Sequence, residues 1–224
     1  MLVITGIILS GLVSGVDAQL EQRDRRQTRQ QLEEIKHALL GFAVANGRLP
    51  CPDSAGNDGI EDPPLGVGGC TDLVSVGNLP WATLGIGQFD AWQRNFTYGV
   101  TPTFADNLVS SAPPASCSSP LGRQPPPPPG VSFELCSVAN FSVLDGAPPG
   151  GATVAQNIAT VVISYGRNGG MAPTNSDETE NQDGDVIAVD KVYSSNPAQP
   201  FDDLVEFIST NELMYTMLAG GVFR

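Results

Sequence analysis

The longest regular pattern of hydrophobic and polar positions lies in the first 45 residues. The stretch Met1–Val16 is apolar and uncharged, and residues 17–45 contain no proline and are rich in the helix formers Gln, Glu, Arg, Leu and Ala. Further along, apolar residues recur at spacings of three, four and three, which places them in one stripe on a helix: Leu32, Ile35, Leu39 and Phe42. The pattern predicts one continuous helix of about 46 residues, roughly 69 Å long.

The predicted helix has a sharp end. Gly47 favours the left-handed conformation in which many helices end, and Pro50 prevents the helix from continuing. The first third of the helix is apolar, the middle is polar, and the last third has a face to bury in a domain. We therefore expect a stalk helix at residues 1–46 and a globular head at residues 47–224.

The head shows shorter patterns that are typical of strands separated by turns. Strands are predicted at five runs: Phe96–Thr101, Val131–Val138, Ile158–Tyr165, Val186–Tyr193 and Leu204–Ile208. The most apolar run, 158–165, is expected at the centre of the sheet. Because the chain has 25 Gly and 19 Pro, much of the head must be loop, including the proline run at 125–129. The predicted fold class is α+β, with the stalk helix packed on an antiparallel sheet that has long, disulfide-closed loops.

A short helix is predicted near the end of the sequence. Ser209 and Glu212 have the spacing of a capping box, in which the serine caps the first turn and the glutamate reaches back to it. This helix would end at Gly220-Gly221. It would present four apolar residues on one side: Leu213, Met214, Met217 and Leu218.

The apolar start of the chain has three interpretations. As a secretory signal cleaved after Ala18, residues 1–18 lack the basic residues that normally precede the apolar run. As a membrane span, the uncharged stretch falls short of the roughly 20 residues that are needed. As a helix that packs against copies of itself, it has small residues that let helix backbones approach closely: Gly6, Ser10, Gly11, Ser14 and Gly15. Because the helical pattern continues beyond residue 18, the third interpretation is favoured.

The net charge of −13 belongs entirely to the head, because residues 1–36 contain equal numbers of basic and acidic side chains. An acidic head repels phosphate backbones, so we expect it to bind no nucleic acid. The basic residues at 23–29 are interleaved with acids and are expected to lie on a solvated helix face rather than on anionic lipid.

The four cysteines are expected to form disulfides. Cys51 and Cys70 are nineteen positions apart, as are Cys117 and Cys136, and the sequence has no CxxC pair. A zinc site usually needs close ligand pairs, and the single histidine, His37, lies on the predicted stalk. A catalytic Cys51–His37 pair would have to reach past the end of the helix. Two local disulfides are the better interpretation, and they indicate an oxidising compartment.

No pattern of catalytic residues stands out, and we expect the protein not to be an enzyme. With one histidine, serine-type and metal hydrolase chemistry lacks its usual base or ligands. The densest acidic run, at 175–185, is interpreted as a solvated loop. Its oxygen ligands would also suit calcium, and Asp183 and Asp185 are then the first candidates, because Gly184 allows a sharp turn between them. No other cofactor is expected.

The apolar start MLVITGIILSGLV, followed by QLEQRDRRQTRQQLEEIKHALLGFAVANGRLPCP, resembles the N-terminal region of type IV pilin-like proteins, which include minor pilins and the pseudopilins of type II secretion. The resemblance covers most of the chain and extends into the head. The segments that carry it there are Leu79–Gly85, Asp90-Ala91-Trp92, Phe96-Thr97-Tyr98 and Phe201–Val205.

The resemblance implies a structural subunit of a pilus or pseudopilus. Before assembly, such a subunit is held in the inner membrane. It then assembles through its N-terminal helix, with copies of itself and with other pilin-like subunits, into a periplasmic or extracellular filament. The glycine–phenylalanine junction and the glutamate of the family's processing motif are missing, and Met1-Leu2-Val3 matches what normally follows that glutamate. We therefore expect the sequence to begin a few residues inside the mature subunit.

Two other functions are kept as alternatives. One is a secreted ligand-binding protein or enzyme, for which residues 1–18 are a cleaved signal and the mature chain begins at Gln19. The other is a periplasmic binding head held singly in the membrane by the same residues. Neither alternative requires the stalk helix to pack against other copies.

Overall fold

The computed structural model describes residues 2–64, 70, 76–106, 131–173 and 175–223, and for residues 2–16 it describes the backbone but not the side chains. Two features predicted from the sequence, the proline run at 125–129 and the position of Cys117, lie outside the described residues.

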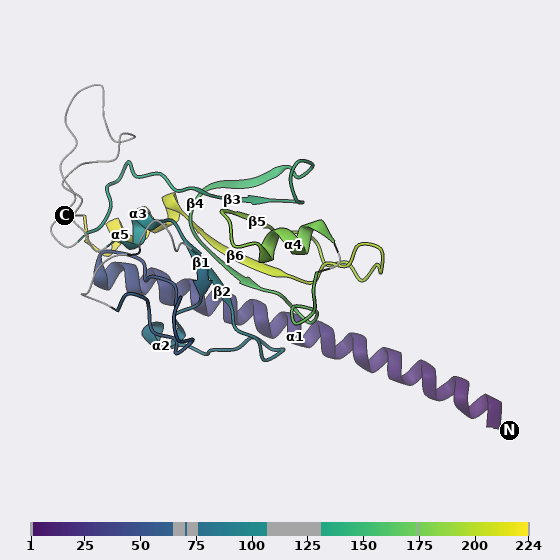
Figure 1. The fold of residues 1–224 in the computed structure, drawn as a ribbon. Coiled ribbons are helices and arrows are strands. Elements are labelled where there is room, and N and C mark those ends of the chain that lie inside the picture. The colour runs from purple at the N-terminus through teal and green to yellow at the C-terminus, as the bar shows by residue number, and fades with distance from the viewer. Residues whose placement is uncertain (1, 65–69, 71–75, 107–130, 174, 224) are drawn as a thin grey trace.

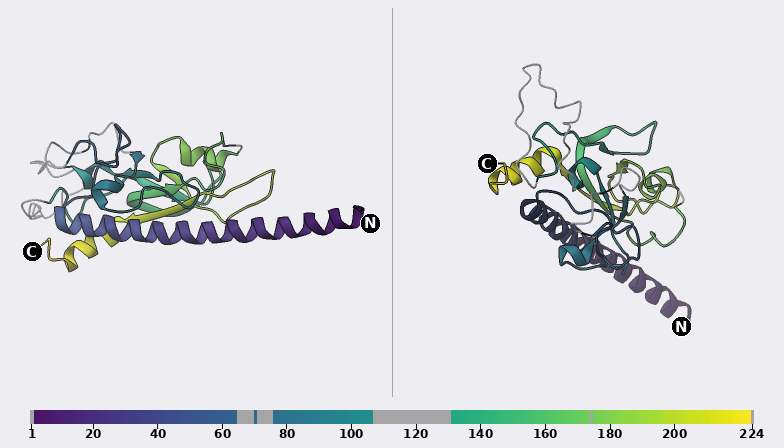
Figure 2. Two further views of the ribbon diagram at one scale, coloured as in Figure 1. Left: turned by 90° about the horizontal axis from the view of Figure 1, so that it is seen from below. Right: turned by 60° about the vertical axis from the view of Figure 1, so that its left-hand side comes forward.

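The first helix, α1 (Leu2–Asn46), is unbroken over its 45 residues, which is about 68 Å at 1.5 Å per residue. The head lies along its C-terminal part, and its N-terminal part extends beyond the head (Figures 1 and 2). Gly47 has a φ of 71°, and its N–H donates to the carbonyl of Ala43 at 2.8 Å. The predicted helix and its end at Gly47 are therefore confirmed.

The head is built on one six-stranded sheet. Its main order is β1-β2-β4-β3-β5, and β6 also pairs with β4. The strands are β1 (Val76–Asn78), β2 (Thr97–Val100), β3 (Phe141–Leu144), β4 (Thr153–Ser164), β5 (Ile187–Val189) and β6 (Leu204–Ser209). The predicted central strand is confirmed, because β4 pairs with three other strands.

The expected antiparallel sheet is wrong for one pair, because β3 and β5 are parallel. The chain reverses direction between β4 and β5, but β5 pairs with β3 and not with β4. Since β3 is antiparallel to β4, β5 must run parallel to β3. The sheet is therefore mixed, and the α+β class stands.

Some of the predicted strands differ from the observed ones. The segment 131–138 forms no strand: Val131 and Phe133 are buried, but Ser137 N–H donates to Glu134 O at 2.9 Å and closes a turn. The run 186–193 forms a strand only at β5. Strands β1 and β3, of three and four residues, were not predicted because they are too short for a clear alternation.

Four short helices complete the described part of the head: α2 (Trp81–Leu84), α3 (Pro102–Ala105), α4 (Ser176–Gln182) and α5 (Thr210–Ala219). The serine half of the predicted capping box is confirmed, because Ser209 Oγ accepts a hydrogen bond from Glu212 N–H at 3.2 Å. The carboxylate of Glu212 lies 3.1 Å from Lys36 Nζ. Three of its four predicted core residues are buried, but Leu218 is 48% exposed. It therefore lies outside the α5 face that packs on the core.

Apolar side chains pack together on both faces of the sheet. On one face, α1 and α5 enclose a core with β2 and β6, and Ala159 and Val162 of β4 belong to it. On the other face, Val161 and Ile163 pack with Phe141 and Ala188 in a smaller core. Because neighbouring residues of β4 point to opposite faces and both faces are packed, apolar residues stand next to each other at Val161, Val162 and Ile163.

Candidate functional site: the stalk–head junction

The junction is the face of α1 that packs against the head. Its apolar part consists of buried residues three or four positions apart: Leu32, Ile35, Leu39 and Ala43. The predicted stripe is thus confirmed except at its end, because Phe42 is only partly buried and Ala43 is fully buried. The guanidinium carbon of Arg48 lies 5.6 Å from the centre of the Phe42 ring.

The buried face continues toward the N-terminus with polar residues, so the predicted solvated face at 23–29 is wrong for Arg25 and Thr28. Thr28 is fully buried, and its Oγ1 accepts a hydrogen bond from Ala91 N–H at 3.2 Å. Arg25 donates from Nη1 to the backbone carbonyl of Asp202 at 3.1 Å and lies 4.2 Å from the centre of the Tyr193 ring. Burial lowers the pKa of Arg25, as does the neighbouring Arg29.

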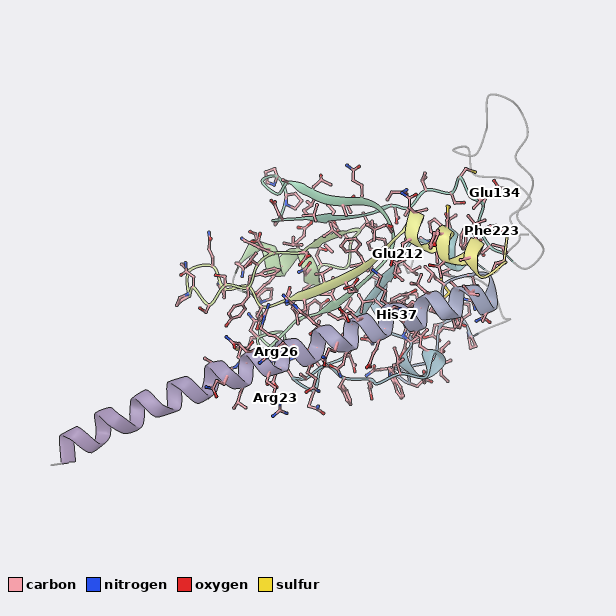
Figure 3. The ribbon with its side chains drawn as sticks, turned by 180° about the vertical axis from the view of Figure 1, so that it is seen from behind. Arg23, Arg26, His37, Glu134, Glu212 and Phe223 are labelled. Carbon is pink, nitrogen blue, oxygen red and sulfur yellow. A yellow bond between two sulfur atoms is a disulfide. The ribbon has the colours of Figure 1, made fainter. Side chains whose placement is uncertain are left out.

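Lys36 joins the stalk to two elements of the head. Its Nζ lies 3.1 Å from a carboxylate oxygen of Glu206 on β6 and 3.1 Å from one of Glu212 on α5. Burial by itself would lower the pKa of Lys36, but the hydrogen bonds to Glu212 and Glu206 outweigh it and raise the pKa. Figure 3 shows Glu212 on α5 above α1, and Arg23 and Arg26 on α1 near the edge of the head.

At the C-terminal end of the stalk, a buried ion pair holds the chain as it enters the head. Arg48 contacts both carboxylate oxygens of Glu61, at 2.8 and 2.9 Å, and the two residues are 3% and 1% exposed. Glu61 also accepts from Cys51 N–H at 3.0 Å, and Arg48 donates to Leu49 O at 2.9 Å. Two buried charges arranged in this way satisfy each other.

The predicted disulfide between Cys51 and Cys70 is confirmed, with their Cα atoms 5.5 Å apart. It lies shortly after the end of α1. Because the two sulfur atoms are bonded to each other, Cys51 cannot form a catalytic pair with His37, whose side chain is exposed. Cys136 is also in a disulfide, but Cys117, its predicted partner, lies outside the described residues.

The acidic run at 175–185 differs from the predicted loop, because most of it forms α4. Asn175 Oδ1 accepts from Glu178 N–H at 3.0 Å and caps this helix, a role for which asparagine is well suited. The helix turns Glu178 and Asn181 into the head, where they are 1% and 3% exposed. The prediction of a fully solvated segment is therefore wrong for these two residues.

Three buried carboxylates meet at this end of the head, and we call them the carboxylate cluster: Glu178, Asp202 and Asp203. Glu178 belongs to α4, and the two aspartates come directly before β6. One carboxylate oxygen from each residue lies within 4.8 Å of those from the other two. Their exposed fractions are 1%, 8% and 1%, so each residue is more than nine-tenths buried.

Two asparagines hold the carboxylate cluster in place. Asn168 donates from its backbone to Asp202 Oδ2 at 3.1 Å and from its side chain to Glu178 Oε1 at 2.9 Å. Asn181 donates to Asp203 Oδ2 at 2.8 Å. The other oxygens of the aspartates, Asp202 Oδ1 and Asp203 Oδ1, are buried and accept no hydrogen bond within the described part of the chain.

The surroundings of the cluster disfavour its negative charge. Burial raises the pKa of Asp203 to about 7; the hydrogen bond from Asn181 opposes this shift, and the charges of Glu178 and Asp202 add to it. Burial likewise raises the pKa of Asp202, against the hydrogen bond from Asn168. Three carboxylates so close together need a proton or a cation to balance them.

The predicted calcium ligands Asp183 and Asp185 are close together, and Glu180 joins them within 4.8 Å. Both aspartates are exposed. Asp183 Oδ1 accepts from Asp185 N–H at 3.1 Å, and Asp185 Oδ1 accepts from Ile187 N–H at 2.6 Å, so these carboxylates support the turn into β5. Calcium at these two residues stays a prediction, since exposed acidic groups are common without an ion.

The small residues predicted to pack between helices, Gly6, Ser10, Gly11, Ser14 and Gly15, lie on the part of α1 whose side chains are not described. Among the residues that the structure describes, no helix has an apolar stretch long enough to cross a membrane. Because those side chains are not described, the role of the small residues stays a prediction.

The carboxylate cluster was missed at the level of sequence, although one pattern pointed to it. Asp202 and Asp203 stand between Phe201 and Leu204, which are both buried. Two acids enclosed by apolar residues at the start of a strand are unusual, because acidic side chains are rarely buried unless they are paired.

Comparisons of the chain with models of protein families, with curated proteins and with solved structures found no match.

Proposed function

We propose that this protein is a structural subunit of a bacterial filament of the type IV pilus or type II secretion pseudopilus kind. It assembles through the N-terminal part of α1 with copies of itself and with other pilin-like subunits. Before assembly, the helix lies in the inner membrane and the head in the periplasm. After assembly, the head faces outward and makes the contacts of the filament. No step of this function requires catalysis.

The unbroken α1 is the observation that supports this proposal most. Residues 17–20 are exposed, and Arg25 is the first residue of α1 that the structure shows as buried. The helix nevertheless continues to Leu2, so roughly 19 residues, or about 28 Å, extend beyond the head. Most of the stability of helices in proteins comes from packing against a partner, so a partner is expected to cover this part of α1. The apolar sequence of residues 1–16 suits a lipid or helical partner.

The stalk–head junction supports the same proposal in a second way. The stalk is fixed to the head by an apolar stripe, by Lys36 and by Arg25. A rigid joint of this kind transmits force between a helix core and an outer head, as a filament requires. A secreted protein from which residues 1–18 are cleaved would keep this junction but would lose the part of α1 that extends beyond the head.

Electron microscopy of sheared surface material tests the proposal. Surface filaments sheared from the bacterium that produces this protein would be collected, and their subunits would be analysed by N-terminal sequencing. We expect filaments that contain this chain with residues 1–16 intact. Replacing Gly11 by leucine is expected to remove the chain from filaments, because a large side chain prevents close helix packing.

Gly41→Leu is the matched control on the same helix. A Cβ at Gly41 meets nothing within 4 Å, so this variant is expected to enter filaments as the wild type does. A mature chain that begins at Gln19 would contradict the proposal. So would a protein found only as single copies in detergent, or a Gly11→Leu variant that assembles normally.

A further inference from the structure

The carboxylate cluster carries more negative charge than the surrounding described residues neutralise. No salt bridge in the described part of the chain joins Glu178, Asp202 or Asp203 to a basic side chain. Arg25 is near, but it donates to the backbone carbonyl of Asp202 and not to a carboxylate. In contrast, the buried Glu61 has both oxygens paired with Arg48. Buried carboxylates without such a partner are costly, so they favour a proton or a cationic ligand.

The two unpartnered oxygens indicate what that ligand offers. Asp202 Oδ1 and Asp203 Oδ1 are buried acceptors without donors, in carboxylates that converge on each other and on Glu178. Each aspartate has its second oxygen held by a hydrogen bond, from Asn168 or from Asn181, so the carboxylates are fixed in orientation. A group that binds several fixed carboxylate oxygens at once must be positively charged and compact. A metal cation has these properties.

We infer that Glu178, Asp202 and Asp203 bind one divalent cation and that this cation is calcium. Calcium binds oxygens at 2.3–2.6 Å, so two oxygens on opposite sides of one ion lie at most about 5 Å apart. The three carboxylate oxygens lie within 4.8 Å of one another, so each pair of them meets this limit. Magnesium binds oxygens at about 2.1 Å and loses its water reluctantly, so a buried site lined by carboxylates suits it less.

A pocket borders one residue of the carboxylate cluster, Asp203. A pocket of about 210 Å³ lies between α1 and the segments before β6, and Asp203 forms part of its wall. The acidic residues Glu33, Asp190 and Glu206 also line it, together with the basic Arg29 and Lys191. The pocket therefore borders the carboxylate cluster at Asp203, on the side of the stalk, and several carboxylates line it.

Cation binding at this site would lock three parts of the molecule together. Glu178 fixes α4, and the two aspartates fix the end of the long segment that follows β5. The carbonyl of Asp202 receives the hydrogen bond from Arg25, so α1 is held through the same residue. The inference concerns the head and its junction with the stalk, and it does not depend on whether the chain assembles into a filament.

Calcium titration of the full chain in detergent tests this inference. After treatment with a chelator, the protein would be titrated with CaCl2 at pH 7.5 by calorimetry, and its thermal unfolding followed in parallel. We expect one ion per chain and a melting temperature that rises with calcium until the site is saturated. We expect MgCl2 at the same concentrations to have a smaller effect.

Charge-removing variants locate the site. Asp203→Asn and Glu178→Gln keep the shape of the side chains, and each is expected to weaken calcium binding at least tenfold. The double variant Asp183→Asn, Asp185→Asn is the matched control, because it removes two charges from the exposed acidic group on the same segment. It is expected to bind calcium as the wild type does.

Three results would overturn the inference. The first is a folded wild-type chain that binds no calcium at millimolar concentration, which would mean that protons alone balance the cluster. The second is binding that the Asp183, Asp185 double variant abolishes. The third is binding that survives in Asp203→Asn and Glu178→Gln. If a variant fails to fold, as judged by circular dichroism without calcium, the wild-type stoichiometry and the double variant still decide the question.

Discussion

The two ends of the stalk–head junction are held by different chemistry. At the C-terminal end, Leu39 and Ala43 are buried among apolar side chains, and in the buried ion pair Arg48–Glu61 each charge has its partner. At the N-terminal end, polar residues replace the apolar stripe, and Arg25 contacts a backbone carbonyl beside three unneutralised carboxylates. One end is therefore stable with the groups that the chain itself supplies. The other end is sensitive to what the solution supplies.

Glu61→Gln should have the largest effect, because it removes one partner of a buried ion pair and leaves the charge of Arg48 uncompensated. We expect a loss of about 4 kcal/mol in the free energy of unfolding. Urea denaturation of the full chain in detergent measures it. Glu34→Gln, on the exposed face of α1, is the control and should change stability by less than about 0.5 kcal/mol. Equal effects of the two variants would show that the ion pair is not buried.

Leu39→Ala should have the next largest effect. Leu39 is fully buried between the stalk and the head, so the variant loses apolar burial and leaves a cavity. A loss of about 3 kcal/mol is expected from the same denaturation experiment. Leu20→Ala is the matched variant at the other end of the helix, where the side chain is 47% exposed. If Leu20→Ala destabilised the head as much, the head would extend further along α1 than the structure indicates.

The stability of the calcium-free protein should depend on pH through Asp203. Its pKa in the folded state, about 7, is above its ordinary value of 3.8, so the folded state binds the proton more tightly than the unfolded state does. This contribution is fully present below about pH 4 and is lost as the pH rises through 7. Between about pH 5 and about pH 7, Asp203 should contribute a loss of about 2 kcal/mol.

The free energy of unfolding should be measured for wild type and for Asp203→Asn, both in chelator. The difference between the two values isolates the contribution of Asp203 from that of other acids. The difference should shrink or change sign across this range of pH. A constant difference would mean that Asp203 is ionised in the folded state at all these pH values.

Arg25→Met should have the smallest effect of the four changes. The variant keeps most of the length of the side chain but loses one hydrogen bond to Asp202 and the contact with the Tyr193 ring. We expect a loss of about 1 kcal/mol, because each of these contacts is modest. Arg26→Met is the control, since Arg26 is exposed and bonds only to its own helix at Gln22 O in the described residues. An effect as large as that of Leu39→Ala would mean that the polar end is no weaker than the apolar end.

The sequence by itself determined the local features of this protein. The length of α1, its end at Gly47 and most of its buried stripe follow from helix propensity and spacing, which act over a few neighbouring residues. The cap at Ser209 and the apolar central strand follow from equally local patterns. The Cys51–Cys70 disulfide was predicted for the same reason, because its two cysteines are close in the chain.

Only the tertiary structure decided which polar residues are buried and which strands are neighbours. Glu178 and Asp203 are 25 positions apart, and nothing near either residue specifies that they meet. Likewise, β5 is parallel to β3 because of where β5 pairs in the sheet, and 131–138 turns although its composition favours a strand. Burial depends on contacts between distant segments, so the charge balance at each end of the stalk–head junction could be found only from the folded chain.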